Sequence, residues 1–130
     1  SQSLRALEGA WVLLYQLFYN LINNSIKFAK EGTTPEITIT AEKSIYKGKN
    51  AAVITLKDKG IGFDNDQAGQ IFETFTRLNS KDRYEGTGLG LSLCKKIAER
   101  HGGTIAAFGI PDKEAVFIIT LPLEQHVNDI

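Results

Sequence analysis

Four polar residues share one line along a predicted helix. Over residues 12–29, apolar side chains recur at intervals of three and four, the pattern of an amphipathic helix. At 100° per residue, Gln16, Asn20, Asn24 and Lys27 fall within about 40° of one line, with Asn23 just beside it. An amide oxygen suits Mg²⁺, an ion normally shared with phosphate oxygens, and a lysine one turn further on can bind those phosphates. The spacing leaves two interpretations open: a line that faces a ligand, or the solvated side of the helix.

The stretch "DKGIGF" has the residue types of one end of a ligand pocket. Asp58 follows a predicted strand, and Gly60 and Gly62 come shortly after it. Two glycines in three residues permit unusual backbone angles and the close approach of a flat ligand. A carboxylate beside apolar residues can accept a hydrogen bond from an exocyclic amine such as that of adenine. The alternative is an ordinary turn, in which this pattern is common.

A second glycine cluster lies in "EGTGLGLSLCKK". Gly86, Gly88 and Gly90 come directly before a predicted helix, where free backbone N–H groups and the helix dipole favour phosphate. The spacing is not that of a Rossmann fingerprint, and no Gly-Lys-Ser/Thr follows as in a Walker loop. The alternative is a flexible loop and a helix cap.

Short helices and strands are predicted to position these residues. Helices are expected over residues 12–29, 70–75 and 90–101. Strands are expected over residues 36–42, 51–57, 104–108 and 115–121, with a short edge strand over residues 4–7 and a long hairpin loop over residues 44–50. The predicted fold is α/β: a layer of strands with one face buried against about three helices. Two hairpins argue against a doubly wound parallel sheet.

The composition is that of one ordinary globular domain. The 130 residues are 42% hydrophobic, and 15 basic residues balance 15 acidic ones. Zero net charge gives no support for nucleic-acid or anionic-membrane binding. One cysteine and the absence of a signal peptide or a long apolar run indicate a cytoplasmic domain without direct membrane contact, although a parent protein could be anchored elsewhere. The start without methionine suggests a fragment.

Four stretches together resemble a known family. "QLFYNLINNSIKF", "DKGIGF", "IFETFTRL" and "EGTGLGLSLCKKIAERHGG" stand in the order of the N, G1, F and G2 boxes of the catalytic ATP-binding domain of sensor histidine kinases. That domain belongs to the Bergerat-fold family shared with gyrase, the MutL mismatch-repair ATPases and a heat-shock chaperone. The resemblance runs from about residue 8 to 123. It implies a two-layer sandwich, in which about three helices cover one face of a mixed, mostly antiparallel sheet.

The resemblance also implies roles for single residues in binding Mg²⁺ and ATP. It makes Asn24 the Mg²⁺ ligand, Asn20 a neighbour of the phosphates and Lys27 a phosphate contact. Phe28 becomes an aromatic residue near the nucleotide, and Asp58 the aspartate that reads adenine. The other implied ATP-binding residues are Gly60, Gly62, Arg77, Thr87, Gly88, Leu89 and Gly90. The resemblance implies that Gly60 and Gly62 shape the adenine pocket and that Arg77 reaches the γ-phosphate. Residues 87–90 supply backbone amides to the phosphates.

Domain boundaries follow from the same resemblance. Residues 1–130 form a single catalytic ATP-binding domain, in which residues 64–85 are a mobile ATP lid and residues 124–130 a frayed tail. The dimerisation domain that carries the phosphoacceptor is absent. The implied partners are the dimerisation and phosphoacceptor helices of the same kinase and a downstream response regulator.

The implied reaction is phosphoryl transfer to histidine rather than hydrolysis. Relatives that hydrolyse ATP place a glutamate base one turn before the metal-binding asparagine, whereas this chain has Asn20 there. Neither His101 nor His126 is expected to be the acceptor, so the chain supplies no general base and no acceptor. Two alternatives stay open: a nucleotide-binding sensing or docking module without transfer, and a Bergerat-fold ATPase.

Overall fold

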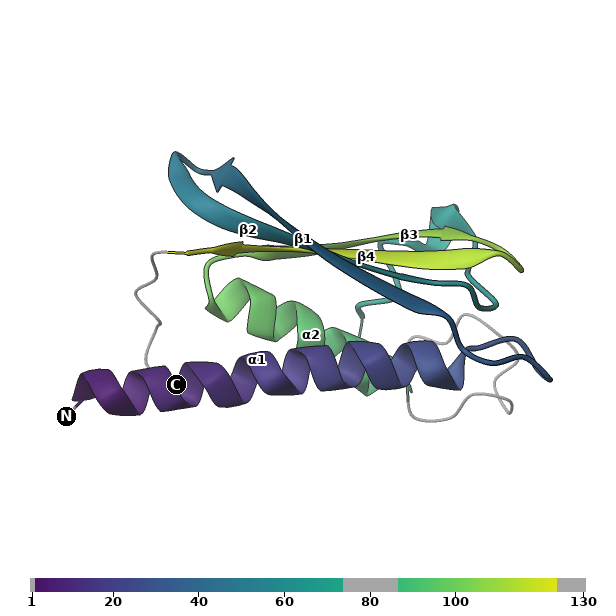
Figure 1. The fold of residues 1–130 in the computed structure, drawn as a ribbon, viewed down its shortest axis with the longest axis horizontal. Coiled ribbons are helices and arrows are strands. Elements are labelled where there is room, and N and C mark those ends of the chain that lie inside the picture. The colour runs from purple at the N-terminus through teal and green to yellow at the C-terminus, as the bar shows by residue number, and fades with distance from the viewer. Residues whose placement is uncertain (1, 74–86, 124–130) are drawn as a thin grey trace.

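A computed structural model describes the backbone of residues 2–73 and 87–123, and the side chains of residues 12–73 and 91–123. Its described part is a four-stranded antiparallel sheet with two α-helices on one face (Figure 1). The elements in chain order are α1 (Gln2–Lys27), β1 (Ile37–Tyr46), β2 (Lys49–Asp58), the 3₁₀-helix η1 (Asn65–Gln67), α2 (Thr87–Arg100), β3 (Thr104–Ile110) and β4 (Glu114–Pro122). The spatial strand order is β1-β2-β4-β3, so the second hairpin joins the first through β4.

The core lies between the sheet and the two helices. Along β4 burial alternates strictly, so that Phe117 and Ile119 point to the helices and the residues between them point away. α1 contributes Leu17 and Leu21 and α2 contributes Ile97, and all three side chains are almost fully buried. Each such side chain stabilises the fold by roughly 1.5–3 kcal/mol. This layer fixes the position of α1 against the sheet, and α1 carries most of the predicted site.

Several predicted boundaries are wrong at the N-terminal end. The edge strand expected over residues 4–7 is instead helical, because α1 begins at Gln2 and continues to Lys27. Gly9 is tolerated inside this helix at a cost of about 1 kcal/mol, because its neighbours Ala6, Leu7 and Ala10 are good helix formers. The helix ends two residues before the predicted end, where Ala29 forms an isolated bridge with Gly60.

The first hairpin is longer than predicted. Residues 44–50 were expected to form a long loop, but β1 and β2 pair as far as Tyr46 opposite Lys49. Only Lys47 and Gly48 remain in the turn, both with positive φ (52° and 77°). That backbone is typical of the type I′ turn, whose twist matches a tight hairpin. The strands therefore extend beyond the alternating segments from which they were predicted.

The sheet and helix count also differ from expectation. The described strands pair only in antiparallel fashion, so the mixed sheet is not observed in residues 2–73 and 87–123. In the same residues two α-helices cover the sheet, and the short helix expected over residues 70–75 does not form in its described part, which is turn as far as Glu73. Ile71 and Phe72 are nevertheless buried, and Phe72 packs edge-on against Phe117. Tertiary packing, not helix formation, holds this segment.

Candidate functional site

The end of α1 is fixed to the turn that follows β2. The N–H group of Ile61 donates to the carbonyl oxygen of Phe28 over 2.9 Å, and Ala29 bridges Gly60. Deeper in, the hydroxyl of Ser25 donates to Oδ2 of Asp58 over 2.8 Å. These contacts join residues about 30 positions apart in the sequence. They bring Asp58, the aspartate predicted to read adenine, against the helix that carries Asn20, Asn24 and Lys27. We call these three residues the asparagine line.

Two glycines allow this approach. A Cβ at Gly60 would lie 2.5 Å from the carbonyl oxygen of Phe28 and 3.0 Å from Oδ1 of Asp58. Gly62 has a φ of +61°, and a Cβ there would lie 2.1 Å from the carbonyl oxygen of Ile110. Distances below 3.0 Å are not tolerated by real Cβ atoms, so both positions require glycine. The turn "DKGIGF" thus allows a close approach, but its neighbours here are backbone atoms, and the approach of a flat ligand stays a prediction.

Asp58 is a buried carboxyl group with several hydrogen-bond donors. It is 4% exposed at the end of β2. Burial, the largest effect, raises its pKa above the ordinary value of 3.8, and the charge of Glu114 raises it further. Hydrogen bonds from Ser25 and from the backbone N–H groups of Gly60 and Ala115 lower it, but they do not cancel the effect of burial. Most of the donors around this group therefore stabilise its ionised form.

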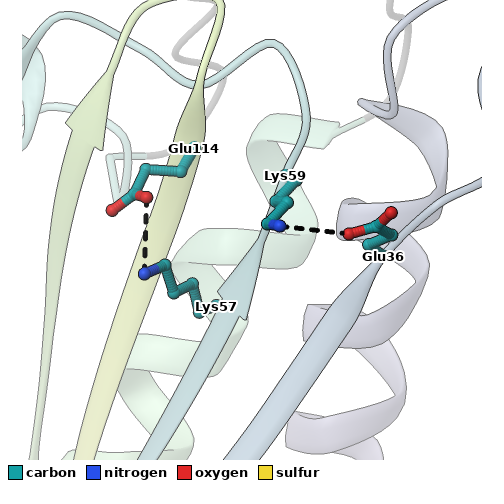
Figure 2. Close-up of polar contacts among 4 residues, drawn as sticks. All are labelled: Glu36, Lys57, Lys59 and Glu114. Carbon is teal, nitrogen blue, oxygen red and sulfur yellow. Dashed lines mark ion pairs between the residues drawn. The ribbon is translucent and has the colours of Figure 1, made fainter.

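Two ion pairs lie around the same end of the sheet (Figure 2). Lys57 on β2 pairs with Glu114 on β4 over 3.5 Å, and Lys59 pairs with Glu36 over 3.4 Å. The side chains of the second pair are both about two-thirds exposed, so that pair adds little stability. The first pair partly neutralises Glu114, the acidic residue that acts on Asp58.

The raised pKa of Asp58 predicts a specific pH dependence of stability. Between 3.8 and the higher pKa of the folded state, the folded chain binds more protons than the unfolded chain. The free energy of unfolding should therefore fall as pH rises through this window. Asp58→Asn removes the titrating group, so the wild type should lose stability relative to this variant across the window. Urea unfolding at a series of pH values measures the difference. The exposed Asp66→Asn serves as control, and parallel curves for wild type and Asp58→Asn would contradict the prediction.

The asparagine line divides into inward and outward residues. Asn24 is half-buried, and its Oδ1 is a buried atom with no hydrogen-bond partner among the described residues. Asn20 is half-buried, whereas Asn23, which lies beside the line, is exposed. Lys27 is exposed and Phe28 half-buried at the helix end. A buried oxygen without a donor is unusual, and it is the kind of neutral oxygen ligand that Mg²⁺ accepts together with phosphate.

The chemistry of this donor set suits a shared magnesium ion. The described residues contain no group of three or more His, Cys, Asp or Glu side chains that could hold a metal ion by themselves. A single amide oxygen cannot hold Mg²⁺ alone, but it can complete a coordination shell supplied mainly by water and phosphate. The site therefore fits an ion that arrives with a nucleotide.

The second glycine cluster is partly described. α2 begins at Thr87, three residues before the predicted start at Gly90, so 87–90 form the first turn of the helix. The first N–H groups of a helix have no partner within it, which is the basis of phosphate binding at such an end. Their contact with phosphate stays a prediction. Arg77 and Gly86 lie outside the described residues.

The beginning of the segment predicted as a lid is attached to the domain. Asp64 caps η1 by accepting a hydrogen bond from the N–H group of Asp66 over 3.0 Å. Oδ1 of Asn65 accepts from the N–H group of Gly109 on β3 over 3.2 Å. Residues 74–85, the larger part of the predicted lid, lie outside the described residues.

Sequence reasoning missed Ser25. It lies on the same helical stripe as Leu17 and Leu21, which are eight and four residues earlier, and it is 1% exposed. A hydroxyl on the buried stripe of a helix needs a partner. The signal was therefore a serine where the apolar pattern calls for an aliphatic side chain.

Two other residues with reactive side chains are buried. The Cys94 thiol is fully buried and donates to the carbonyl oxygen of Leu17 over 3.5 Å, and burial raises its pKa to about 12. Its surroundings are those of a small core residue. His101 is 3% exposed at the end of α2, where its Nδ1 donates to the carbonyl oxygen of Ile97 over 2.9 Å. That it accepts no phosphoryl group stays a prediction. In the described part of the chain, no helix has the length and apolarity to cross a membrane.

Nearly the whole chain is similar to known proteins. Residues 9–125 match the family described as "Histidine kinase-, DNA gyrase B-, and HSP90-like ATPase". The phytochrome-like protein Cph1 of Synechocystis sp. is 38% identical over 121 residues, which are 93% of this chain and 16% of that protein. The sensor histidine kinase RppB of Synechocystis sp. is 38% identical over 113 residues, 85% of this chain and 23% of that protein. The chain thus spans less than a quarter of either relative.

Solved structures show the same fold. The mycobacterial sensor histidine kinase MprB superposes with a TM-score of 0.73 at 23% identity, over 85% of this chain and 72% of that one. Full-length ShkA, solved in complex with AMPPNP, superposes with a TM-score of 0.68 at 25% identity, over 88% of this chain and 22% of that one.

Proposed function

Because the chain belongs to the family of histidine kinase-, DNA gyrase B- and HSP90-like ATPases, we propose that it binds Mg·ATP and transfers the γ-phosphoryl group to a histidine of a separate dimerisation domain. The chain is the catalytic ATP-binding domain of the sensor histidine kinase type. In the proposal, residues 1–130 form one domain with a lid over residues 64–85. Its partners are the phosphoacceptor helices of the same kinase and, downstream, a response regulator in the cytoplasm.

The observation that carries the proposal concerns two adjacent residues of α1, Asn24 and Ser25, each of which places an unusual polar group inside the domain. Asn24 presents a buried oxygen without a partner, and Ser25 holds the buried carboxylate of Asp58. In the proposed complex Asp58 accepts from the amine of adenine, and Asn24 ligates the magnesium ion that ATP carries. Gly60 and Gly62 shape the base pocket, because they let the backbone of Phe28 and Ile110 lie close to the turn after β2. In the proposal Asp58 thus acts on the base, and Asn24 acts on the metal ion and the phosphates.

The remaining contacts act on the phosphates. Lys27 contributes a positive charge from the end of α1, with Asn20 beside the phosphates one turn before Asn24. The first N–H groups of α2 at 87–90 bind phosphate oxygens, and Arg77 reaches the γ-phosphate. Phe28 packs near the nucleotide. Magnesium, when bound, neutralises charge that develops on the β- and γ-phosphate oxygens.

The transfer step requires groups from outside this chain. A ring nitrogen of the acceptor histidine forms a bond to the γ-phosphorus, and the bond from that phosphorus to the bridging oxygen breaks, so that ADP leaves. The proton of the attacking imidazole passes to an acidic residue of the dimerisation domain. This chain contributes position and charge stabilisation. Asn20 cannot act as a base, because an amide does not take up a proton near neutral pH, and this favours transfer over hydrolysis.

Asp58→Asn should reduce the affinity for Mg·ATP by at least about ten-fold. The variant replaces an ionised acceptor of the adenine amine with a group that presents two N–H donors, and hydrogen bonds to charged groups are worth about 1.5–3 kcal/mol. Titration calorimetry with the non-hydrolysable analogue AMPPNP and Mg²⁺ measures the change, and Glu42→Gln, at an exposed position on β1, should bind as the wild type does. An unchanged affinity would remove Asp58 from the base pocket.

The transfer itself is tested by mixing the chain with the acceptor domain of a matching kinase and labelled ATP. We expect acid-labile phosphohistidine on the acceptor. If none forms while the full-length kinase produces it, transfer by this chain is rejected. Steady release of phosphate by the chain alone would instead favour the ATPase alternative.

A further inference from the structure

Ser25 is a buried hydroxyl whose role the proposed function leaves open. It is 1% exposed on α1, and its Oγ donates to Oδ2 of Asp58 over 2.8 Å, across 33 positions of sequence. Asp58 itself is 4% exposed. A hydrogen bond from a hydroxyl to an ionised carboxylate is among the strong ones, and exclusion of water strengthens it further. The contact is therefore well placed to control both the orientation and the charge of the carboxylate.

The hydrogen bond distinguishes the two oxygens of Asp58. Oδ2 is occupied by Ser25, whereas Oδ1 lies on the side of Gly60, 3.0 Å from the place that a Cβ of this glycine would occupy. Backbone N–H groups of Gly60 and Ala115 also donate to the carboxylate. N–H groups can only donate, so these two favour the ionised carboxylate over the neutral carboxyl. The donors thus hold the carboxylate in one orientation and oppose the rise in its pKa that burial causes.

We propose that Ser25 is a positioning and specificity-determining residue, whose hydroxyl keeps the Asp58 carboxylate ionised and turned so that Oδ1 faces the exocyclic amine of a purine. This inference rests on the proposed function, in which Asp58 binds the adenine base. An ionised carboxylate attracts the amine of adenine and repels the carbonyl oxygen that guanine has in the same place. A protonated carboxyl donates to that carbonyl oxygen instead. Ser25 therefore protects the preference for adenine against a fall in pH.

The charges around Asp58 set the direction of this effect. Burial raises the pKa of Asp58 and Ser25 lowers it, so removal of the hydroxyl moves the pKa further upward. Glu114 of β4 also raises it, although Glu114 is paired with Lys57 of β2. Lys59, after β2, is paired with Glu36, and α1 brings Lys27 two residues beyond Ser25. These groups are unchanged in a variant of Ser25, which isolates the effect of the hydroxyl.

Two variants test the proposal. Ser25→Ala removes the hydroxyl, and Ser25→Cys keeps its approximate size while leaving only a weak donor. Titration calorimetry measures binding of Mg·AMPPNP and Mg·GMPPNP at a series of pH values, from neutral pH down to the lowest pH at which the domain stays folded. For both variants we expect affinity for AMPPNP to fall relative to the wild type as pH decreases, by about ten-fold at the lower end. The preference for AMPPNP over GMPPNP should shrink in parallel.

The design separates the possible failures. Protonation of the nucleotides themselves affects wild type and variants alike, so the wild type is measured in the same buffers. In an Asp58→Asn background, Ser25→Ala should not change how the affinity for AMPPNP depends on pH. A loss that is equal at all pH values, or no loss, would overturn the role of Ser25 and reduce it to packing. If the wild type binds no AMPPNP, the proposed function fails instead. Should Ser25→Ala not fold, Ser25→Cys alone decides the outcome.

Discussion

Asn24→Ala is expected to reduce phosphoryl transfer by at least about a hundred-fold without reducing the stability of the domain. Removal of a single group that stabilises transition-state charge typically lowers the rate by 10²- to 10³-fold. Oδ1 of Asn24 has no hydrogen-bond partner among the described residues, so its loss breaks no contact of that oxygen. Burying a polar atom without a partner costs about 1–3 kcal/mol. The free energy of unfolding should therefore stay the same or rise.

A neighbour on the same helix offers a matched control. Asn23→Ala makes the same chemical change one residue earlier, at an exposed position beside the asparagine line. It should retain transfer and stability. Phosphohistidine formation on an added acceptor domain and urea unfolding provide the two measurements. If Asn24→Ala unfolds the domain, or if both variants lose activity alike, Asn24 has no special role at the phosphates.

Gly62→Ala is expected to destabilise the domain by at least about 3 kcal/mol. Its φ of +61° disfavours every residue with a Cβ, by roughly 1–2 kcal/mol. The added Cβ would also lie 2.1 Å from the carbonyl oxygen of Ile110 and 2.6 Å from that of Glu114. Both atoms belong to the backbone beside the β3–β4 turn, so a side-chain rotation cannot relieve the contact. Separation of this turn from the end of β2 would also disturb the hydrogen bond from Asp112 to Ile61, whose distance is 2.6 Å.

The result can be separated from a general effect of glycine substitution. Gly69→Ala is the control, because a Cβ at Gly69 meets no atom within 4 Å and its φ is not in the left-handed region. Its stability should stay within about 0.5 kcal/mol of the wild type. Thermal unfolding of Gly62→Ala should occur roughly 10 °C or more below the wild type. A shift as small as that of Gly69→Ala would mean that the β3–β4 turn moves freely.

Much of the fold could be predicted because the core follows simple periods. The buried stripe of α1, the alternation along β4 and the turn residues between them identify a sheet with helices on one face. The pattern failed where context outweighs local preference. The edge strand expected over residues 4–7 is part of a helix that continues through Gly9, and a two-residue turn with a left-handed Lys47 closes a hairpin where polar residues suggested a loop. Neither result is visible in hydrophobic spacing.

Only part of the site could be predicted, because spacing along a helix does not show which of its polar residues are buried. The spacing of Asn20, Asn24 and Lys27 identified a polar line, but not which of its residues is buried. The structure distinguishes Asn24, whose oxygen is enclosed, from the exposed Asn23. The contact between Ser25 and Asp58 joins distant parts of the chain, and only the packing of α1 against β2 creates it. Local sequence cannot report such a contact, although the serine on an apolar stripe was a sign of it.

The adjacency of Asn24 and Ser25 constrains how this site can be altered. The two residues share one turn of α1, and the bridge from Ala29 to Gly60 with the hydrogen bond from Ile61 to Phe28 ties that turn to the sheet. A rotation or a slide of α1 would displace both residues together. Recognition at the base and at the phosphates is therefore mechanically coupled through the helix. A change in base preference that leaves Asn24 in place would therefore need substitutions outside α1 and away from Gly60, whose Cβ would meet the carbonyl oxygen of Phe28 at the end of that helix.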